Sequence, residues 1–328
     1  MDASVLLVLI VVVALLFEFA NGWNDAANSI ATIVSTRVLK PLPAVAWAAF
    51  WNFVAAFTFG TAVAKTIGTK MINLDMINGW VLLTGLLGAI IWTGVCTWLG
   101  LPISVSHSLI GGYAGAAIAH AGFGALILGG WVKPVLGIFL APFIGMFGSI
   151  LVTIVTSWIV YRQAPQKIDR WFRRLQLVSA AAFSLGHGTN DAQKGMGIIT
   201  AALVTSGAVT VYEVPFWVII TCHLAIAAGT LGGGWRVIKT MGQNITKLTP
   251  FGGFAAESAA ALTLFGTAAT GIPASTTHTV TGSIIGVGAS RRLTAVRWGI
   301  TRPIFIAWAL TMPGAAALGA LLYWLIGR

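Results

Sequence analysis

The sequence predicts an all-α membrane protein made of two inverted-topology repeats that contain discontinuous or re-entrant helices. Three observations lead to this fold class: the composition, a duplicated pair of polar motifs, and the distribution of Lys and Arg. The chain has 328 residues, of which 57% are hydrophobic and 8% are charged, whereas an ordinary soluble protein has about 25% charged residues. Membrane-spanning β-strands would alternate polar and apolar residues over about ten positions. The apolar runs here are continuous, so helices are expected.

The apolar runs follow one another from the N-terminus. The segment before Asn21 lacks the basic stretch and the small-residue cleavage site of a signal peptide, so it is interpreted as a retained first span. Further runs, such as Trp80 to Leu99 and Val132 to Val160, reach or exceed the roughly 20 residues that a helix needs to cross ~30 Å of hydrocarbon. These runs predict a multi-pass protein of the inner (plasma) membrane.

Two polar motifs each occur twice along the chain. The segment FEFANGWNDAANS, Phe17 to Ser29, aligns with FSLGHGTNDAQKG, Phe183 to Gly195. The segment LPISVSHSLIGG, Leu101 to Gly112, aligns with IPASTTHTVTGS, Ile272 to Ser283, at nearly the same separation along the chain. Two collinear pairs of matched polar residues indicate an internal duplication.

The basic residues indicate that the two copies have opposite orientations. Lys and Arg follow the first motif in the first half but the second motif in the second half, and such residues collect in cytoplasmic loops. Both termini are therefore expected outside, which assigns most of the Lys and Arg residues to cytoplasmic segments. The expected organisation is a first repeat over residues 1–160, a basic cytoplasmic linker over 161–174 and a second repeat over 175–328. Inverted repeats of this kind are an architecture of secondary transporters.

Four of the eight acidic residues, Glu18, Asp25, Asp191 and Glu257, fall inside apolar segments. An unpaired charge there costs at least ~2.5 kcal/mol on insertion scales. Asp25 and Asp191 each follow a Gly and an Asn that can break the helix, so side-chain oxygens and freed carbonyls could converge on a cation, either Na⁺ or a proton. Alternatively, each Asp caps a half-helix that follows it.

Three further residues near these acids have open roles. Lys194 stands where the first copy has Asn28, and it could form an i, i+3 ion pair with Asp191 or contact an anion. Glu257 lies among small residues suited to close helix packing, and it could equally be a third cation ligand. His187 neighbours the second Asp motif and could tune that motif alone, because its counterpart is Asn21.

The second motif supplies hydroxyl groups directly after a Gly-x-Pro sequence in each copy. Pro halts the incoming helix, and the new helix start offers unpaired N–H groups and the positive end of the dipole to an anion. Two such starts in inverted halves could hold a tetrahedral oxyanion from both sides, although a lone start would favour a kink or a cap. The matched His residues could donate to the anion, carry a coupled proton or bond a backbone carbonyl. The residues assigned to the anion are Ser104, Ser106, His107, Ser275, Thr276, Thr277, His278 and Lys194.

The pair GWNDAANS and GTNDAQKGMG, together with the duplicated Pro-x-Ser-x-x-His segments, resembles the inorganic phosphate transporter (PiT) family over nearly the whole chain. The resemblance implies a helical secondary transporter, often dimeric, that carries inorganic phosphate with Na⁺ or H⁺. The family's motif residues correspond to Asn24, Asp25, Asn28, Asn190, Asp191 and Lys194. Trp23 departs from the small residue usual in the family, which affects the expected packing there rather than the chemistry.

The sequence therefore predicts an ion-coupled phosphate symporter that needs no cofactor besides its coupling ion. The cation ligands assigned are Asn24, Asp25, Asn28, Asn190, Asp191 and Glu257, with Na⁺ as the candidate metal at Asp25 and Asp191. Expected partners are phosphate, Na⁺ or H⁺ and the lipid bilayer, and a second copy of the chain is a candidate partner in a homodimer. Nucleic acid is excluded because the basic residues are scattered in short segments rather than gathered on one face.

Several alternatives remain at this stage. A sulfate permease of the same family would use similar hydroxyl-lined helix starts, and a channel would use a similar path. An intramembrane hydrolase with Ser, His and Asp is conceivable, but an enzyme has no need of two inverted copies. The residue types do not distinguish Na⁺ from H⁺, or free phosphate from a metal-phosphate complex.

Overall fold

The computed structural model describes residues 2–58 and 60–327, and within these ranges the chain forms twelve α-helices and no β-strand. The α-helices are α1 (Ala3–Ser35), α2 (Pro41–Val54), α3 (Ala62–Lys65), α4 (Gly79–Leu99), α5 (Val105–Ala121), α6 (Leu128–Val160), α7 (Pro165–Thr205), α8 (Phe216–Gly232), α9 (Trp235–Asn244), α10 (Pro250–Thr270), α11 (Thr276–Arg291) and α12 (Trp298–Ile326). Short 3-10 or π-helical turns are η1 (Ala55–Phe57), η2 (Thr66–Lys70), η3 (Leu74–Met76), η4 (Phe123–Ala125) and η5 (Leu293–Ala295).

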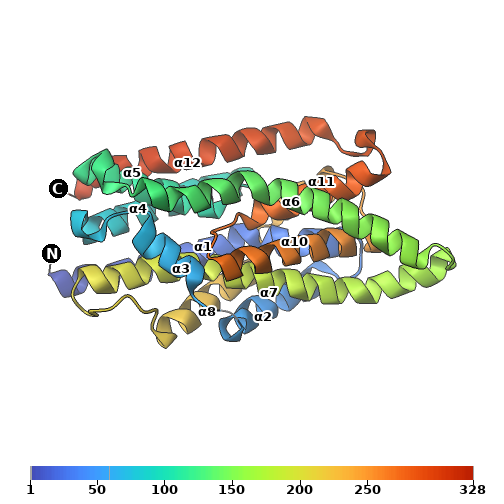
Figure 1. Cartoon of the computed structure of the whole chain (residues 1–328), viewed down its shortest axis with the longest axis horizontal. Helices are drawn as coiled ribbons and strands as arrows, with labels where there is room; N and C mark the ends of the chain where they lie inside the picture. The colour runs from blue at the N-terminus through green and yellow to red at the C-terminus, as the bar shows by residue number, and fades with distance from the viewer. Residues whose placement is uncertain (1, 59, 328) are drawn as a thin grey trace.

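The two halves of the chain have inverted topology, as the sequence predicted. α1 and α7 run in opposite directions, and both termini lie at one end of the molecule while the α6–α7 connection lies at the other (Figure 1). The pairs α2–α3 and α8–α9 are each bent by 76°. α6 and α12 each contain two internal prolines, Pro134 and Pro142 in one and Pro303 and Pro313 in the other. The halves therefore repeat the same elements in the same order.

Several helices are long and apolar enough to cross a membrane. Within the described residues, α1, α4, α6 and α12 meet this test, and the number rises to six if each bent pair forms one span. The outer side of α6 is apolar and open, since Phe139, Phe143 and Phe147 are each more than half exposed. Such a continuous exposed apolar face is expected of a helix that contacts lipid.

The helix breaks predicted at the two Gly-x-Pro sequences are present. Gly100 follows α4 with φ +73° and Gly271 follows α10 with φ +67°, so both adopt the left-handed conformation that glycine tolerates. In each copy the glycine N–H and the next N–H bond back to carbonyls in the last turn of the helix that ends there. The prolines then lie in an extended segment before α5 or α11 begins. The repeat thus ends and restarts its helix by the same local geometry in both halves.

The breaks predicted at the two Asn-Asp motifs are wrong, because α1 and α7 continue through them. The motif glycines serve close helix packing instead. A Cβ at Gly22 would lie 2.0 Å from the Ile226 carbonyl oxygen in α8, and one at Gly188 would lie 2.6 Å from the Asn52 carbonyl oxygen in α2. Since no helix begins at either Asp, the alternative interpretation of these residues as helix caps is also excluded.

Helices of each half pack against helices of the other half. α5 packs against α12 and α4, while α11 packs against α6 and α10. The segment predicted as a basic linker starts as a turn and becomes helical at Pro165, where α7 begins. The Arg173 Nη1 atom donates to the Arg37 carbonyl oxygen at 3.1 Å, which joins the start of α7 to the loop after α1. These basic segments gather at the end of the molecule opposite the termini (Figure 1).

Candidate functional site

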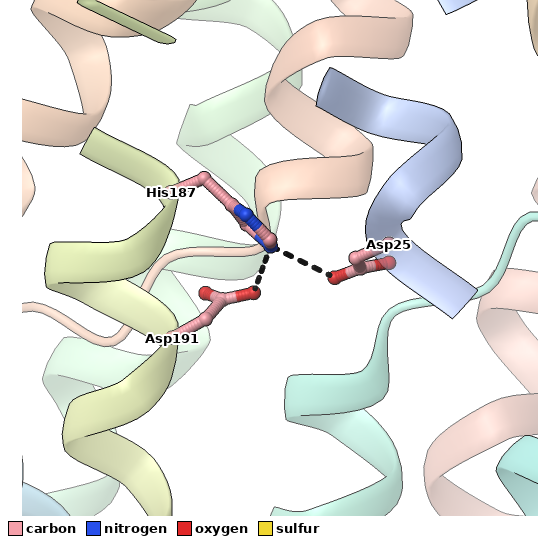
Figure 2. Close-up of side chains that lie close together, drawn as sticks. All are labelled: Asp25, His187 and Asp191. Atoms are coloured by element: carbon pink, nitrogen blue, oxygen red, sulfur yellow. Dashed lines mark ion pairs between the residues drawn. The ribbon is translucent and has the colours of Figure 1, made fainter. Parts of the chain in front are cut away.

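The two Asp residues of the duplicated motif meet where α1 and α7 pack together. Asp25, His187 and Asp191 are buried, and one ligand atom from each lies within 4.8 Å of the others. The His187 Nε2 atom is 3.2 Å from Asp191 Oδ2 and 3.8 Å from Asp25 Oδ2 (Figure 2). The fold thus brings together two carboxylates that are distant along the chain, as the duplication predicted. Carboxylate and imidazole groups around one point are suited to holding a cation.

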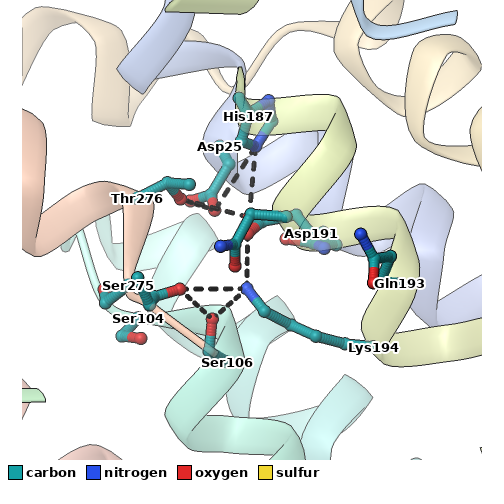
Figure 3. A network of polar contacts seen from close by, with 12 residues as sticks. Asp25, Ser104, Ser106, His187, Asp191, Gln193, Lys194, Ser275 and Thr276 are labelled. Carbon is teal, nitrogen blue, oxygen red and sulfur yellow. Dashed lines mark hydrogen bonds and ion pairs between the residues drawn. The ribbon is translucent and has the colours of Figure 1, made fainter. Parts of the chain in front are cut away.

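The start of α11 contacts both Asp residues. The Thr276 Oγ1 atom lies 3.1 Å from Asp25 Oδ2 and 3.1 Å from Asp191 Oδ2 (Figure 3). The Thr277 Oγ1 atom lies 3.1 Å from Asp25 Oδ1, and it accepts a hydrogen bond of 3.0 Å from Asn28 Nδ2. A hydroxyl group predicted for the anion therefore touches carboxylates predicted for the cation, so the two parts of the site are contiguous.

The two Pro-containing turns contact each other in a symmetric way. Thr277 Oγ1 donates to the Ile103 carbonyl oxygen at 2.8 Å, and Ser106 Oγ donates to the Ala274 carbonyl oxygen at 3.4 Å. Thr277 is the counterpart of Ser106 in the aligned second motifs, and Ala274 is the counterpart of Ile103. Each helix start thus bonds to the turn that precedes the other helix. The turns face a common interior and not the lipid.

The first turns of α5 and α11 are capped in the same manner. Ser104 Oγ accepts from the His107 N–H at 3.3 Å, and Ser275 Oγ accepts from the His278 N–H at 3.2 Å. Such caps satisfy one of the N–H groups that lack an acceptor within the helix. The other N–H groups at a helix start favour an anion, so the caps hold each first turn in shape for such a ligand.

Lys194 lies at the centre of the same cluster. Its side chain is fully buried, and its Nζ atom donates to Asp191 Oδ1 and Ser106 Oγ (Figure 3). The Nζ atom also donates to the Ala274 carbonyl oxygen. The i, i+3 ion pair considered from the sequence is therefore present. The ammonium group joins the Asp motif of α7 to the start of α5.

Two of the motif asparagines, Asn24 and Asn190, are held by threonines that the sequence did not single out. Asn24 Nδ2 donates to Thr97 Oγ1 at 2.7 Å, and Asn190 Nδ2 donates to Thr267 Oγ1 at 3.2 Å. Both threonines lie in the last turn before a Gly-x-Pro break, and this shared position is the signal that could have identified them. The Oδ1 atoms of Asn24, Asn28 and Asn190 are buried without a hydrogen-bond partner in the described part of the chain. Such oxygens are available as cation ligands.

Glu18 is a further buried acid beside the site. Its Oε1 atom accepts from the Gly195 N–H at 2.7 Å, and its Oε2 atom accepts from Asn21 Nδ2 at 3.3 Å. A Cβ at residue 195 would lie 2.4 Å from this carboxylate, so the glycine lets the carboxylate approach the helix backbone this closely. Glu18 therefore supports the backbone of α7 one turn after Asp191.

Glu257 lies in a separate polar cluster. Its carboxylate accepts from Thr32 Oγ1 at 2.5 Å, Gln176 Nε2 at 3.0 Å and Ser179 Oγ at 2.5 Å. No hydrogen bond or ion pair joins Glu257 to either Asp of the central site among residues 2–58 and 60–327. The fold does not bring this predicted cation ligand to the other ligands.

The two matched histidines lie behind the helix starts. The rings of His107 and His278 are 4.6 Å apart edge to face, and the His278 ring stacks on Trp308 at 3.7 Å. Both line a largely apolar cavity of about 790 Å³ between α6 and α12. Their side chains make no hydrogen bond to Asp25, Asp191 or Lys194 in the described structure. The fold therefore leaves their side chains outside the hydrogen-bond network of the polar cluster.

Comparison with known proteins agrees with this site. Residues 21–319 match the family described as "Phosphate transporter family". The chain belongs to this phosphate transporter family. It is 52% identical to a probable low-affinity inorganic phosphate transporter of Rhizobium meliloti (strain 1021), over 98% of each chain. It is 45% identical to a protein of the same description from Bacillus subtilis (strain 168), over 98% of this chain and 97% of the relative.

A solved structure has the same fold. It is described as "The sodium-dependent phosphate transporter", and it superposes with a TM-score of 0.92 at 25% identity, over 98% of this chain and 99% of the other. Membership of the phosphate transporter family confirms the resemblance inferred from the duplicated motifs. Like its relatives, the chain is a multi-pass membrane transporter and not an enzyme.

Proposed function

We propose that the protein is a secondary active symporter that imports inorganic phosphate together with Na⁺ or H⁺. The observation that carries this proposal is the contact between the carboxylates predicted for the cation and a hydroxyl group predicted for the anion, within one buried site. Two carboxylates from inverted repeats lie within hydrogen-bond reach of the start of α11, through the single hydroxyl group of Thr276. The descriptions of the relatives, which name inorganic phosphate and sodium, support the same substrates.

The proposed cation ligands are the carboxylates and amide oxygens of the two Asp motifs. Asp25 and Asp191 supply negative charge, and the buried Oδ1 atoms of Asn24, Asn28 and Asn190 supply neutral oxygens. Hard cations such as Na⁺ prefer ligands of these types. A proton carried by the same carboxylates is the other form of coupling.

The proposed phosphate ligands are the opposed starts of α5 and α11. The N–H groups of both first turns and the hydroxyls of Ser106 and Thr276 offer donors around one interior space, and the ammonium of Lys194 adds a positive charge beside them. Ser104 and Ser275 hold the two turns in shape as caps. Donors of this kind bind phosphate oxygens at helix N-termini.

Binding of cation and phosphate is expected to be cooperative. Without a cation, the nearby carboxylates repel an incoming anion, and this repulsion is strong because the site is buried in a low dielectric. A bound cation removes the repulsion, so each ligand raises the affinity for the other by the same factor. Alternate exposure of the site follows from the inverted repeats.

The proposed setting is the inner (plasma) membrane with both termini outside. The basic segments lie at the end of the molecule opposite the termini, and such segments face the cytoplasm. The proposed repeats extend over residues 1–160 and 175–328 with the linker over 161–174 between them. A homodimer through the exposed apolar faces is part of the proposal.

The test is uptake of labelled phosphate into proteoliposomes that contain the purified protein. A sodium gradient and a pH gradient are imposed separately, and one of them is expected to drive phosphate above its equilibrium level. Uptake that is insensitive to both gradients would instead indicate a channel. Excess unlabelled phosphate should suppress the uptake and excess sulfate should not, whereas inhibition by sulfate alone would identify a sulfate permease.

The Asp25→Asn variant tests the role of the carboxylate. It removes a charge at nearly constant shape, so gradient-driven uptake should be lost while the protein remains folded. The matched control is Asp75→Asn, which removes an exposed carboxylate far along the chain from the motif. Wild-type uptake by the Asp25→Asn variant would exclude Asp25 from the cation site.

A further inference from the structure

The two copies of the Asp motif differ in one charge. Lys194 and Asn28 occupy the same position in the aligned copies, as do Asp191 and Asp25. At the third position after its Asp, the second copy therefore carries an ammonium group where the first carries an amide. Both side chains are buried, so the difference lies inside the site and not at its surface.

The Lys194 ammonium is bound as a small cation would be. Its Nζ atom contacts three kinds of oxygen: the Asp191 carboxylate, the Ser106 hydroxyl and the Ala274 backbone carbonyl. An ammonium group has three donors, so all of them are used. Carboxylate, hydroxyl and carbonyl oxygens are also the ligands that a hard metal cation selects.

The first copy presents the same three kinds of oxygen. Thr277 and Ile103 correspond to Ser106 and Ala274 when the second motifs are aligned. Thr277 Oγ1 lies 3.1 Å from Asp25 Oδ1 and 2.8 Å from the Ile103 carbonyl oxygen. Beside them is Asn28, whose Oδ1 atom has no hydrogen-bond partner in the described ranges. Here the chain supplies a further oxygen in place of a positive charge.

We propose that Lys194 is a tethered cation that permanently fills one of two repeat-related cation sites. The coupling cation then binds on the Asp25 side only, to the oxygens of Asp25, Thr277, Ile103 and Asn28. With the His187 imidazole neutral, the carboxylates of Asp25 and Asp191 and the ammonium of Lys194 leave one negative charge for that external cation to neutralise. The inference rests on the proposed symport function and assigns it a ratio of one cation per phosphate.

The number of cations carried per phosphate can be measured as the slope of a plot of phosphate accumulation against the cation gradient. Proteoliposomes are loaded with labelled phosphate at a series of gradients of the driving cation, with the membrane potential clamped by K⁺ and valinomycin. The logarithm of the phosphate accumulation ratio at equilibrium rises with the logarithm of the cation gradient, with a slope equal to the number of cations per phosphate. The wild type is expected to give a slope of about one, since one tenfold gradient balances one tenfold accumulation.

The Lys194→Asn variant gives the second motif the residue that the first motif has at the same position, Asn28. It frees the Asp191, Ser106 and Ala274 oxygens for a mobile cation, so the slope should rise to about two. The matched control is Lys194→Met, which removes the charge without supplying an oxygen and should lose phosphate accumulation. The reciprocal variant Asn28→Lys places an ammonium on the Asp25 side and should abolish the response to the gradient.

The outcomes separate this inference from the symport proposal. A wild-type slope of zero overturns the symport proposal itself. A wild-type slope of two overturns the tethered cation, and so does a folded Lys194→Asn variant with a slope of one or with no accumulation. If that variant does not fold, as judged by its Trp fluorescence melting curve, the wild-type slope alone decides.

Discussion

Two regions of the molecule occupy corresponding places in the inverted repeats but differ in polarity. One region, the Glu257 cluster, consists of Thr32, Gln176, Ser179 and Glu257. Their counterparts in the aligned repeats are, in the same order, Ile198, Ile10, Val13 and Leu86, which are all buried in one apolar cluster. The same backbone arrangement therefore holds a satisfied carboxylate in one half and hydrocarbon in the other.

The difference indicates that the fold does not require the Glu257 cluster. A buried carboxylate is costly unless donors surround it, and here three side chains from α1 and α7 supply the donors. The apolar version obtains its stability from burial alone. We infer that the Glu257 cluster has a function in transport rather than in folding.

The largest effect is expected from making the apolar region resemble the polar one by a single change. Leu86→Glu places a carboxylate among Ile10, Val13 and Ile198, which offer no donor. An uncompensated buried charge costs about 3–5 kcal/mol, so the variant should fail to fold or melt far below the wild type. Melting in detergent, followed by Trp fluorescence, measures this. The control Leu86→Met conserves volume and should cost less than ~1.5 kcal/mol; equal melting of both variants would contradict the comparison.

A smaller loss is expected from the opposite single change. Glu257→Leu removes the acceptor of three donors, but the Ser179 hydroxyl already lies 3.2 Å from the Gln176 carbonyl oxygen and can donate there. The Thr32 hydroxyl can rotate to the carbonyl oxygen four residues before it in α1. The cost should therefore fall mainly on the Gln176 amide, which amounts to ~1–3 kcal/mol for one unsatisfied buried group. Glu257→Gln, which keeps an oxygen in place, should cost less. Melting curves of the two variants compare these losses directly, and a larger loss in Glu257→Gln would refute the argument.

A still smaller change in stability is expected when the whole cluster is exchanged. The fourfold variant Thr32→Ile, Gln176→Ile, Ser179→Val and Glu257→Leu reproduces the apolar region and leaves no unsatisfied polar group among the four positions. Replacing all partners of a buried polar network by apolar groups of similar shape is often nearly neutral, so the variant should melt within ~1 kcal/mol of the wild type. Its phosphate uptake should nevertheless fall. Normal uptake would mean that the cluster has no function in transport.

The sequence was sufficient for the parts of the structure that depend on duplication and local chemistry. The Gly-x-Pro breaks follow from the conformations open to glycine and proline, and both are present. The meeting of Asp25 and Asp191 was expected from the duplicated motif, because transporters built from inverted repeats place their ligand site at the interface of the repeats. The assignment of the chain to its family rested on the same motifs.

Other features depend on contacts that no single segment contains. The motif glycines were expected to break α1 and α7, but their environment is the backbone of a neighbouring helix, which only the packed structure provides. The partners of Glu257 come from α1 and from the start of α7, far from it along the chain. His107 and His278 match in sequence, yet the direction of their side chains away from the cluster is set by the packing of α6 and α12 around them.

The smallest effects on transport are expected where the two halves are alike, at the caps of α5 and α11. Ser104→Ala and Ser275→Ala each remove one cap acceptor, which costs ~0.5–2 kcal/mol, and the control Ser290→Ala removes a hydroxyl that caps neither start. If each turn holds phosphate equally, each variant should raise the half-saturating phosphate concentration about fivefold for a loss of ~1 kcal/mol. The double variant should weaken phosphate binding more than either single variant, and the half-saturating cation concentration should change less. If only one of the two single variants raises the half-saturating phosphate concentration, the anion is held by one helix start only. The two halves would then contribute equivalent carboxylates to the central site but not equivalent phosphate ligands.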